Sequence, residues 1–199
     1  MRTRHPLVVS FRMLAALTLL CGGLYPLAVT LLAHWMFPGR SNGSPVFIDG
    51  RLAGSELIAQ NWVGPAYFHG RPSACAYSAL PATASNLAPI SAALHDSIAQ
   101  RRSRFLKENG LADNTAVPAE MLFTSGSGLD PHINPQAARL QVERIAAHRH
   151  WNIEQTRELE ALVKHMTEPR QLGFFGQPRV NVSKLNLMLD RIGGFRKLE

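Results

Sequence analysis

The chain has 199 residues and is basic, with 21 Lys and Arg against 14 Asp and Glu and a formal charge of +7. The basic residues include Arg2, Arg4 and Arg12 near the N-terminus, and the others do not form a basic face interleaved with aromatics, so nucleic-acid binding is not expected. Cys21 lies in an apolar run and Cys75 in a polar region, which predicts neither an internal disulfide nor a cysteine metal site.

The first predicted element is an apolar helix that crosses a membrane. Between Arg12 and Arg40 the chain has no Asp, Glu, Lys or Arg. As a helix, Met13 to Phe37 would reach about 37 Å, and the hydrocarbon core of a bilayer is about 30 Å thick. A cleaved secretory signal is the weaker alternative, because its apolar run is about 7–15 residues long. The predicted organisation is a tail over 1–12, a transmembrane helix over 13–37 and a soluble domain over 38–199.

Five residues of this helix are expected to pack against other membrane helices. Gly22 and Gly23 allow a second helix to approach closely. Pro26 removes one backbone donor, a loss that neighbouring helices or local adjustment must offset in lipid. Tyr25 and Thr30 belong to the same stretch. The alternative is a kink without a partner, because Gly and Pro are common in membrane helices.

The charges that flank the helix predict its orientation. Arg2, Arg4 and Arg12 precede it, whereas Arg40 follows closely and Arg51 lies further on. The positive-inside rule therefore places the N-terminus in the cytoplasm. In a bacterium, this orientation predicts a protein of the cell inner membrane with a periplasmic C-terminal domain.

The soluble part predicts one mixed α/β (α+β) domain of about 160 residues, enough for a core of its own. Apolar spacing and turn residues mark the elements. Asn134-Pro135 is a helix N-cap followed by a first-turn proline. The expected elements are a strand over 46–48 with a turn at Asp49-Gly50, helices over 86–107, 135–149 and 159–166, and an alternating stretch over 180–189 whose offset indicates a bulge or a change from strand to helix.

The densest polar segment is 124–135, which contains Ser, Asp and His. Triad members usually come from separate parts of a fold, and the segment has no G-x-S-x-G elbow, so a serine hydrolase is a minor alternative. A phosphate-binding loop would carry G-x-x-x-x-G-K-[ST], which is absent. We interpret the segment as a tight turn that caps the following helix. Its residues are Ser125, Gly126, Ser127, Gly128, Asp130, His132 and Asn134.

The remaining polar candidates support no catalytic or metal site. His148 and His150 are two residues apart, so on a helix they point in different directions, and no H-E-x-x-H spacing occurs. Arg71, in Tyr67-Phe68-His69-Gly70-Arg71-Pro72-Ser73, either binds an anion or a partner carboxylate, or serves as an internal hydrogen-bond hub. These two interpretations stay open at the level of the sequence.

Many short motifs, in order over most of the chain, resemble one known family. The series begins with Gly23-Leu24-Tyr25-Pro26-Leu27 and continues through the segments 54–60, 67–73, 85–89, 124–135 and 180–190. The chain resembles the C subunit of the bacterial potassium-transporting P-type ATPase, the KdpC family. Each motif is weak alone, and their order makes the resemblance specific.

The resemblance implies a non-catalytic accessory subunit of an ATP-driven potassium importer. Its expected partners are a potassium-channel-like subunit, a P-type ATPase subunit, a small membrane subunit and membrane lipid. The complex, rather than this chain, would handle ATP and K⁺, so no cofactor or metal of its own is expected. The family's C subunit is described as a catalytic chaperone that raises the nucleotide affinity of the ATPase subunit. Gln141 and Arg71 are the expected candidates for a contact with nucleotide or partner, and a membrane-anchored scaffold is the alternative function.

Overall fold

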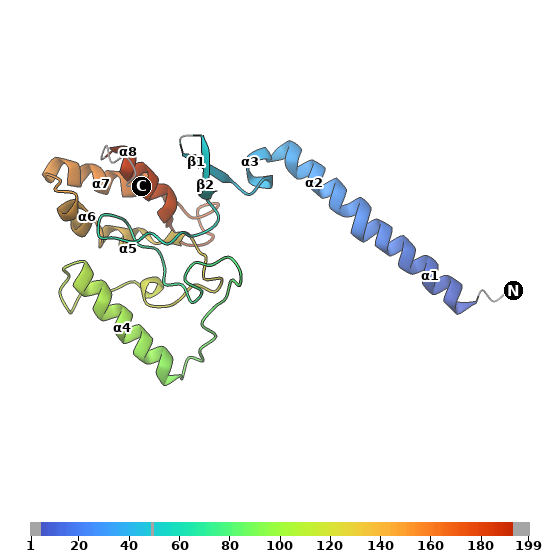
Figure 1. Ribbon diagram of the computed structural model, residues 1–199, viewed down its shortest axis with the longest axis horizontal. Helices are drawn as coiled ribbons and strands as arrows, with labels where there is room; N and C mark the ends of the chain where they lie inside the picture. Colours follow the sequence, from blue (N-terminus) through green and yellow to red (C-terminus); the bar gives the residue numbers. More distant parts are fainter. Residues whose placement is uncertain (1–4, 49, 193–199) are drawn as a thin grey trace. The chain divides into compact units, whose positions relative to one another are not determined.

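The computed structural model describes residues 5–48 and 50–192 and divides the chain into two compact units, Met1–Ser55 and Glu56–Glu199. Figure 1 shows a long helix in the first unit and several separate helices joined by long loops in the second. The predicted combination of an N-terminal apolar helix and a mixed helix-and-sheet domain is therefore confirmed. The predicted membrane boundaries at 12/13 and 37/38 stay predictions.

The N-terminal unit contains one continuous helical span, Pro6–Met36, of 31 residues. It consists of α1 (Pro6–Leu17), the π-helical segment η1 (Thr18–Leu24) and α2 (Tyr25–Met36). Within the described residues it is the one helix long and apolar enough to cross a membrane, and none of its window is buried by the rest of the chain. It begins earlier than the predicted start at Met13, with Pro6 in the first turn, where proline is well tolerated.

Pro26 explains why the span widens into a π-helix. The Tyr25 N–H donates to the carbonyl of Leu20, five residues earlier instead of four. Pro26 has no N–H, and its ring would clash with the carbonyl four residues before it in a regular α-helix. A π-turn placed before the proline relieves that conflict, and π-turns are often found at functional sites.

After the span, the chain forms α3 (Pro38–Ser41) and an antiparallel hairpin of β1 (Pro45–Ile48) and β2 (Arg51–Ser55). The register shifts between Val46 and Phe47, as in a β-bulge. Gly50 has φ +77°, which glycine adopts readily. The strand predicted over 46–48 is confirmed, whereas Asp49 of the predicted turn lies outside the described residues.

The folded unit contains a three-stranded antiparallel sheet in the order β3-β5-β4, with helices that contact its central strand and one another. The 3₁₀ helix η2 (Ala119–Met121) precedes β3. The strands are β3 (His132–Ile133), β4 (Thr167–Glu168) and β5 (Arg179–Asn181). The helices are α4 (Ala92–Glu108), α5 (Pro135–Arg139), α6 (Val142–His148), α7 (Ile153–His165) and α8 (Val182–Ile192).

Apolar side chains from nearly all these elements form one core, which fixes the positions of the loops discussed below. The α8 helix is strongly amphipathic, and its Leu185 and Leu189 are fully buried. The core residues are Phe68, Phe105, Met121, Ile133, Ala137, Ala138, Val142, Ile145, Leu159, Val163, Val180, Val182, Leu185 and Leu189.

All three predicted helices have different bounds in the structure, and the one expected over 159–166 is α7, which already begins at Ile153 and ends at His165. The helix expected over 86–107 begins at Ala92, because the residue before Pro89 is disfavoured in the α conformation and Asn86 has φ +51°. The helix expected over 135–149 is interrupted at Leu140 and Gln141, where the Gln141 N–H donates to the Ala138 carbonyl. The offset seen over 180–189 is confirmed as a change from strand β5 to helix α8.

Candidate functional site

Two buried side-chain amides hold the segment 67–73, which carries one of the sequence motifs. The Gln141 Oε1 accepts from the His69 N–H at 2.8 Å, and its Nε2 donates to the His69 carbonyl at 3.2 Å. Asn186 pairs with Phe68 in the same way, with both distances 2.9 Å. Gln141 and Asn186 are both fully buried. Each amide therefore takes the place of a neighbouring strand for an otherwise irregular segment.

Two arginines of the α6 region bind the carbonyls of residues 65–67, where this segment begins. Arg144 donates to the carbonyls of Pro65 and Tyr67, and also to the side chains of Asn109 and Gln141. Burial lowers the pKa of Arg144 to about 10, although the nearby Glu108 carboxylate opposes the shift. The guanidinium stays charged at neutral pH and is compensated mainly by hydrogen bonds to carbonyl and amide oxygens.

The second arginine, Arg149, lies between two aromatic rings. Its Nε donates to the Ala66 carbonyl at 2.9 Å, and its Nη2 contacts Asp190 at 2.8 Å. Its guanidinium carbon lies 5.1 Å from the ring centroid of Tyr67 and 5.6 Å from that of Trp151. Because the planar guanidinium both stacks and donates, lysine could not replace it here.

The polar segment 124–135 forms an ion-pair cluster with the same 67–73 segment. The Arg71 Nη1 lies 2.8 Å from the Asp130 Oδ2, and the other carboxylate oxygen accepts from the His132 N–H at 3.0 Å and lies 3.3 Å from its Nδ1. Burial raises the pKa of Asp130, but the hydrogen bonds from His132 and Arg71 outweigh it and lower the pKa to about 2. Arg71 thus contacts an internal carboxylate; the contact with a ligand or partner stays a prediction.

This cluster lines a cleft of about 510 Å³. Glu120 borders it, and its carboxylate accepts the backbone N–H of Asn134. Burial raises the pKa of Glu120, while that hydrogen bond and the charge of Arg71 oppose the rise. The Asn134 side chain accepts the Ala137 N–H at 2.7 Å, so the N-cap expected for α5 is present.

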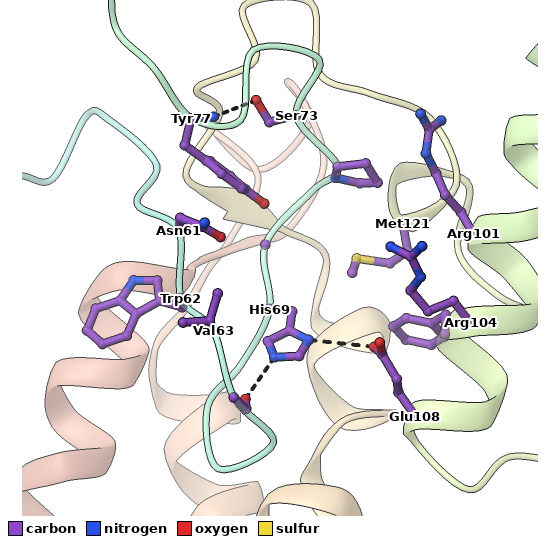
Figure 2. A pocket seen from close by; sticks show the side chains of 14 residues that line it. Asn61, Trp62, Val63, His69, Ser73, Tyr77, Arg101, Arg104, Glu108 and Met121 are labelled. Atoms are coloured by element: carbon purple, nitrogen blue, oxygen red, sulfur yellow. Dashed lines mark hydrogen bonds and ion pairs between the residues drawn. The ribbon is translucent and has the colours of Figure 1, made fainter. Parts of the chain in front are cut away.

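A second cleft, of about 490 Å³, lies between the 61–77 stretch and α4 (Figure 2). In Figure 2 the His69 ring lies centrally, with its Nε2 2.9 Å from the Gly64 carbonyl and its Nδ1 3.9 Å from Glu108. Burial lowers the pKa of His69, as does the charge of Arg144, while the Gly64 and Glu108 contacts oppose the change. Arg101 and Arg104 of α4 border this cleft.

Gly128 shows why the 124–135 loop needs glycine at one position. Its φ is +73°, and an added Cβ would clash with the Cys75 Sγ and lie 2.9 Å from the Thr83 carbonyl oxygen. Gly126, two residues earlier, has no neighbour within 4 Å of such a Cβ. Close packing against the 73–83 stretch therefore requires the glycine at 128.

The two serines of the loop have structural contacts. Ser125 is buried, and its N–H donates to the Pro72 carbonyl at 3.1 Å. The Ser127 hydroxyl accepts the N–H of Leu129 at 3.1 Å. The His132 ring contacts Asp130, and among the described residues neither serine hydroxyl forms a hydrogen bond with that ring.

Two features of the site were not predicted from the sequence. The first is the pairing of Asn186 with Phe68 and of Gln141 with His69, which joins residues far apart in the chain. The second is the capture of three successive carbonyls, 65–67, by Arg144 and Arg149. The spacing of these two arginines beside an otherwise apolar α6 face was the one available signal.

The expected packing residues of the membrane span are exposed or half-buried, as a helix without partners would leave them. A Cβ added at Gly23 would meet nothing within 4 Å, and one at Gly22 would meet only the Thr18 methyl, at 4.0 Å. Tyr25 and Pro26 are the first residues of α2, and the backbone carbonyl oxygen of Thr30 lies 3.0 Å from the Nδ1 of His34. Their packing against other subunits stays a prediction.

Comparison with known proteins places these features in a family. The family model described as "KdpC: K+-transporting ATPase, c chain" matches residues 7–191, which cover both the apolar span and the folded unit. A "Potassium-transporting ATPase KdpC subunit" of Nitratidesulfovibrio vulgaris is 45% identical over 97% of this chain and 95% of its own length. The protein of the same name from Rhodospirillum rubrum is 47% identical over 96% of both chains. That from Dechloromonas aromatica is 44% identical over 94% of this chain and 96% of its own. The chain therefore belongs to the KdpC family.

Proposed function

We propose that this chain is a non-catalytic accessory subunit of an ATP-driven potassium import complex, which it helps to assemble through its membrane helix and its folded domain. The observation that carries the proposal is the family match over 7–191, which includes the span and the folded unit in one alignment. Relatives named as KdpC subunits of potassium-transporting ATPases match with similar coverage. The partners would be a channel-like subunit, a P-type ATPase subunit and a small membrane subunit.

The helix would lie in the bacterial inner membrane with its N-terminus in the cytoplasm. Arg12 precedes the charge-free run, and Arg40 follows it closely. By the positive-inside rule, the arginine-rich tail remains in the cytoplasm and the folded unit lies in the periplasm. Protease added to intact spheroplasts should then digest the folded unit, and digestion only after permeabilisation would refute this orientation.

The contacts of the folded unit support a binding role more than a catalytic one. Gln141 and Asn186 are used by the backbone of the 67–73 segment, and Asp130 is held by Arg71 and His132. These contacts would give partner subunits a rigid surface. An effect on the nucleotide affinity of the ATPase subunit, whose ATP is cytoplasmic, would then have to pass through the membrane helix as a coupling between conformational states.

A substitution at Gly23 tests the assembly role without disturbing this chain. Because a Cβ there meets nothing within 4 Å, Gly23→Leu should leave the helix itself intact. If a partner helix packs closely at this position, the variant should be lost from the complex purified in detergent. Ala28→Leu is the matched control, since five residues of helix rotate it by about 140° from Gly23. Equal recovery of both variants with the other subunits would reject the packing role.

A further inference from the structure

We infer that the hairpin arm formed by residues 169–178 inserts its tip into the lipid surface and so gives the folded unit a second contact with the membrane. The arm links β4 to β5, and its inner rung is the antiparallel bridge between Gln171 and Phe175. The inference goes beyond the proposed assembly role and rests on its membrane anchorage.

Three large apolar side chains are exposed at the tip. Leu172 is 83% exposed, Phe174 64% and Phe175 56%. The rings of Phe174 and Phe175 touch, with centroids 4.2 Å apart. By contrast, Phe68 and Phe105 of the same unit are buried. Two adjacent exposed aromatics beside an exposed leucine form a patch of the kind that marks interaction or membrane sites.

The backbone of the tip is prepared for an apolar environment. Gln171 and Phe175 exchange two hydrogen bonds of 2.9 Å, and the Gly173 and Phe174 N–H groups donate to the carbonyls of Arg170 and Gln171 at 3.2 Å. Unpaired backbone groups would each cost several kcal/mol in lipid, so the four N–H groups paired within the tip lower the cost of moving it out of water. Gly173 makes this compact turn possible at φ +82°.

The base of the arm has the charge expected beside lipid headgroups. Arg179 is paired with Glu168 at 2.9 Å, so these two charges cancel. Arg170 contacts the neutral side chain of Gln177 at 3.3 Å and leaves a net positive charge next to the apolar tip. Aromatic and aliphatic side chains with an adjacent arginine are the usual composition of a segment that lies in the membrane interface.

The chain itself keeps a bilayer within reach of the arm. The residues from Met36, where the apolar span ends, to Glu56, where the folded unit begins, extend at most about 70 Å. The folded unit has an expected radius of gyration of about 14 Å. A tethered domain of this size meets the membrane at high effective concentration, so a small apolar tip suffices for docking. Lipid is therefore the occupant that the structure favours.

Tryptophan fluorescence of the full chain in lipid nanodiscs tests the inference. Phe174→Trp adds a reporter at the tip, and Ile153→Trp adds one at the start of α7, where the side chain is 73% exposed. Lipids brominated in the upper acyl chain should quench the added signal of the tip reporter and not that of the α7 reporter. Leu172→Ser with Phe175→Ser, in the tip-reporter background, should lower the docked-to-free ratio at least tenfold. Arg170→Gln should lower it about fivefold in anionic nanodiscs and leave it unchanged in neutral ones.

The outcomes separate this inference from the proposed function. A tip reporter that is no more quenched than the α7 reporter, in a chain that resists carbonate extraction, would overturn the inference and leave the anchorage intact. A chain that carbonate extracts would overturn both. A tip reporter shielded only after the other subunits are added would assign the tip to a protein partner, which would also overturn lipid docking.

Discussion

Replacing Gln141 by alanine should destabilise the folded unit strongly, because the amide is completely buried and joins three parts of the fold. It accepts from the His69 N–H and from Arg144, and it donates to the carbonyls of His69 and Ala137. Alanine removes all four contacts at once. The interrupted helix between α5 and α6 places this residue against the 67–73 segment, so no neighbouring side chain substitutes for it.

The magnitude follows from these contacts. Each lost hydrogen bond costs about 1 kcal/mol, and a buried donor left without a partner costs about 1–3 kcal/mol. The cavity left by the missing side-chain atoms adds roughly another 1 kcal/mol. Added up over the four contacts, these terms give an upper bound of about 6–8 kcal/mol, and because they overlap and the neighbouring groups relax, we expect the free energy of unfolding to fall by about 3–5 kcal/mol. A domain of this size has about 5–15 kcal/mol in total, so the variant should fold only marginally.

Urea unfolding of the full chain in detergent, followed by tryptophan fluorescence, measures this loss. Gln141→Glu is the matched control, since it keeps the shape and the acceptor oxygen for the His69 N–H but loses the donor to the two carbonyls. It should also be destabilised, because its second oxygen faces the two carbonyls to which the Nε2 donated. A loss below about 1 kcal/mol for Gln141→Ala would refute the structural role. A raised Michaelis constant for ATP in the assembled complex, with stability unchanged, would instead support a direct nucleotide contact.

Two further predictions concern the 124–135 loop. Gly128→Ala should lower the free energy of unfolding by about 2–4 kcal/mol, because the added Cβ clashes with Cys75 and the backbone has φ +73°. Gly126→Ala is the control: its Cβ would enter open space, so its free energy of unfolding in the same urea assay should stay within about 0.5 kcal/mol of wild type. Equal effects of the two substitutions would contradict the packing argument. The pKa of Asp130 is lowered from 3.8 to about 2, so its contribution is present above pH 4 and is lost as the pH falls towards 2. Because the Asp130 side chain is partly exposed, we expect a reduced effect: between pH 5 and pH 2 the free energy of unfolding of wild type should fall by about 1–2 kcal/mol more than that of Asp130→Asn. If the stability of both proteins falls in parallel with pH, the contacts of Asp130 with Arg71 and His132 contribute nothing.

The sequence predicted those parts of the protein whose physics is local. An apolar run without charges has few alternatives to a membrane helix, and the span Pro6–Met36 agrees with it. Asn134 before Pro135 predicted a helix start, and the cap is present. The offset within 180–189 indicated either a bulge or a change from strand to helix, because strands and helices bury residues at different spacings, and the structure shows the second, the passage from β5 to α8.

The tertiary structure decided what the polar side chains do. Propensity favoured one helix over 135–149, but Gln141 sits in a break where its amide reaches His69, 72 residues earlier in the chain. Asn186 reaches Phe68 across 118 residues. Such pairs join segments that lie far apart in the chain, so no local sequence pattern predicts them.

Arg71 illustrates the same division most clearly. The sequence left two interpretations of this residue open, an anion-binding side chain or an internal hub. The fold places its guanidinium 2.8 Å from the carboxylate of Asp130, 59 residues further along the chain, so Arg71 has an ion-pair partner within the domain. Hydrophobic spacing determined where helices and strands form, because burial acts on each segment in turn. The partner of each charge was decided by the packed core, since an ion pair depends on distances that the chain acquires when it folds.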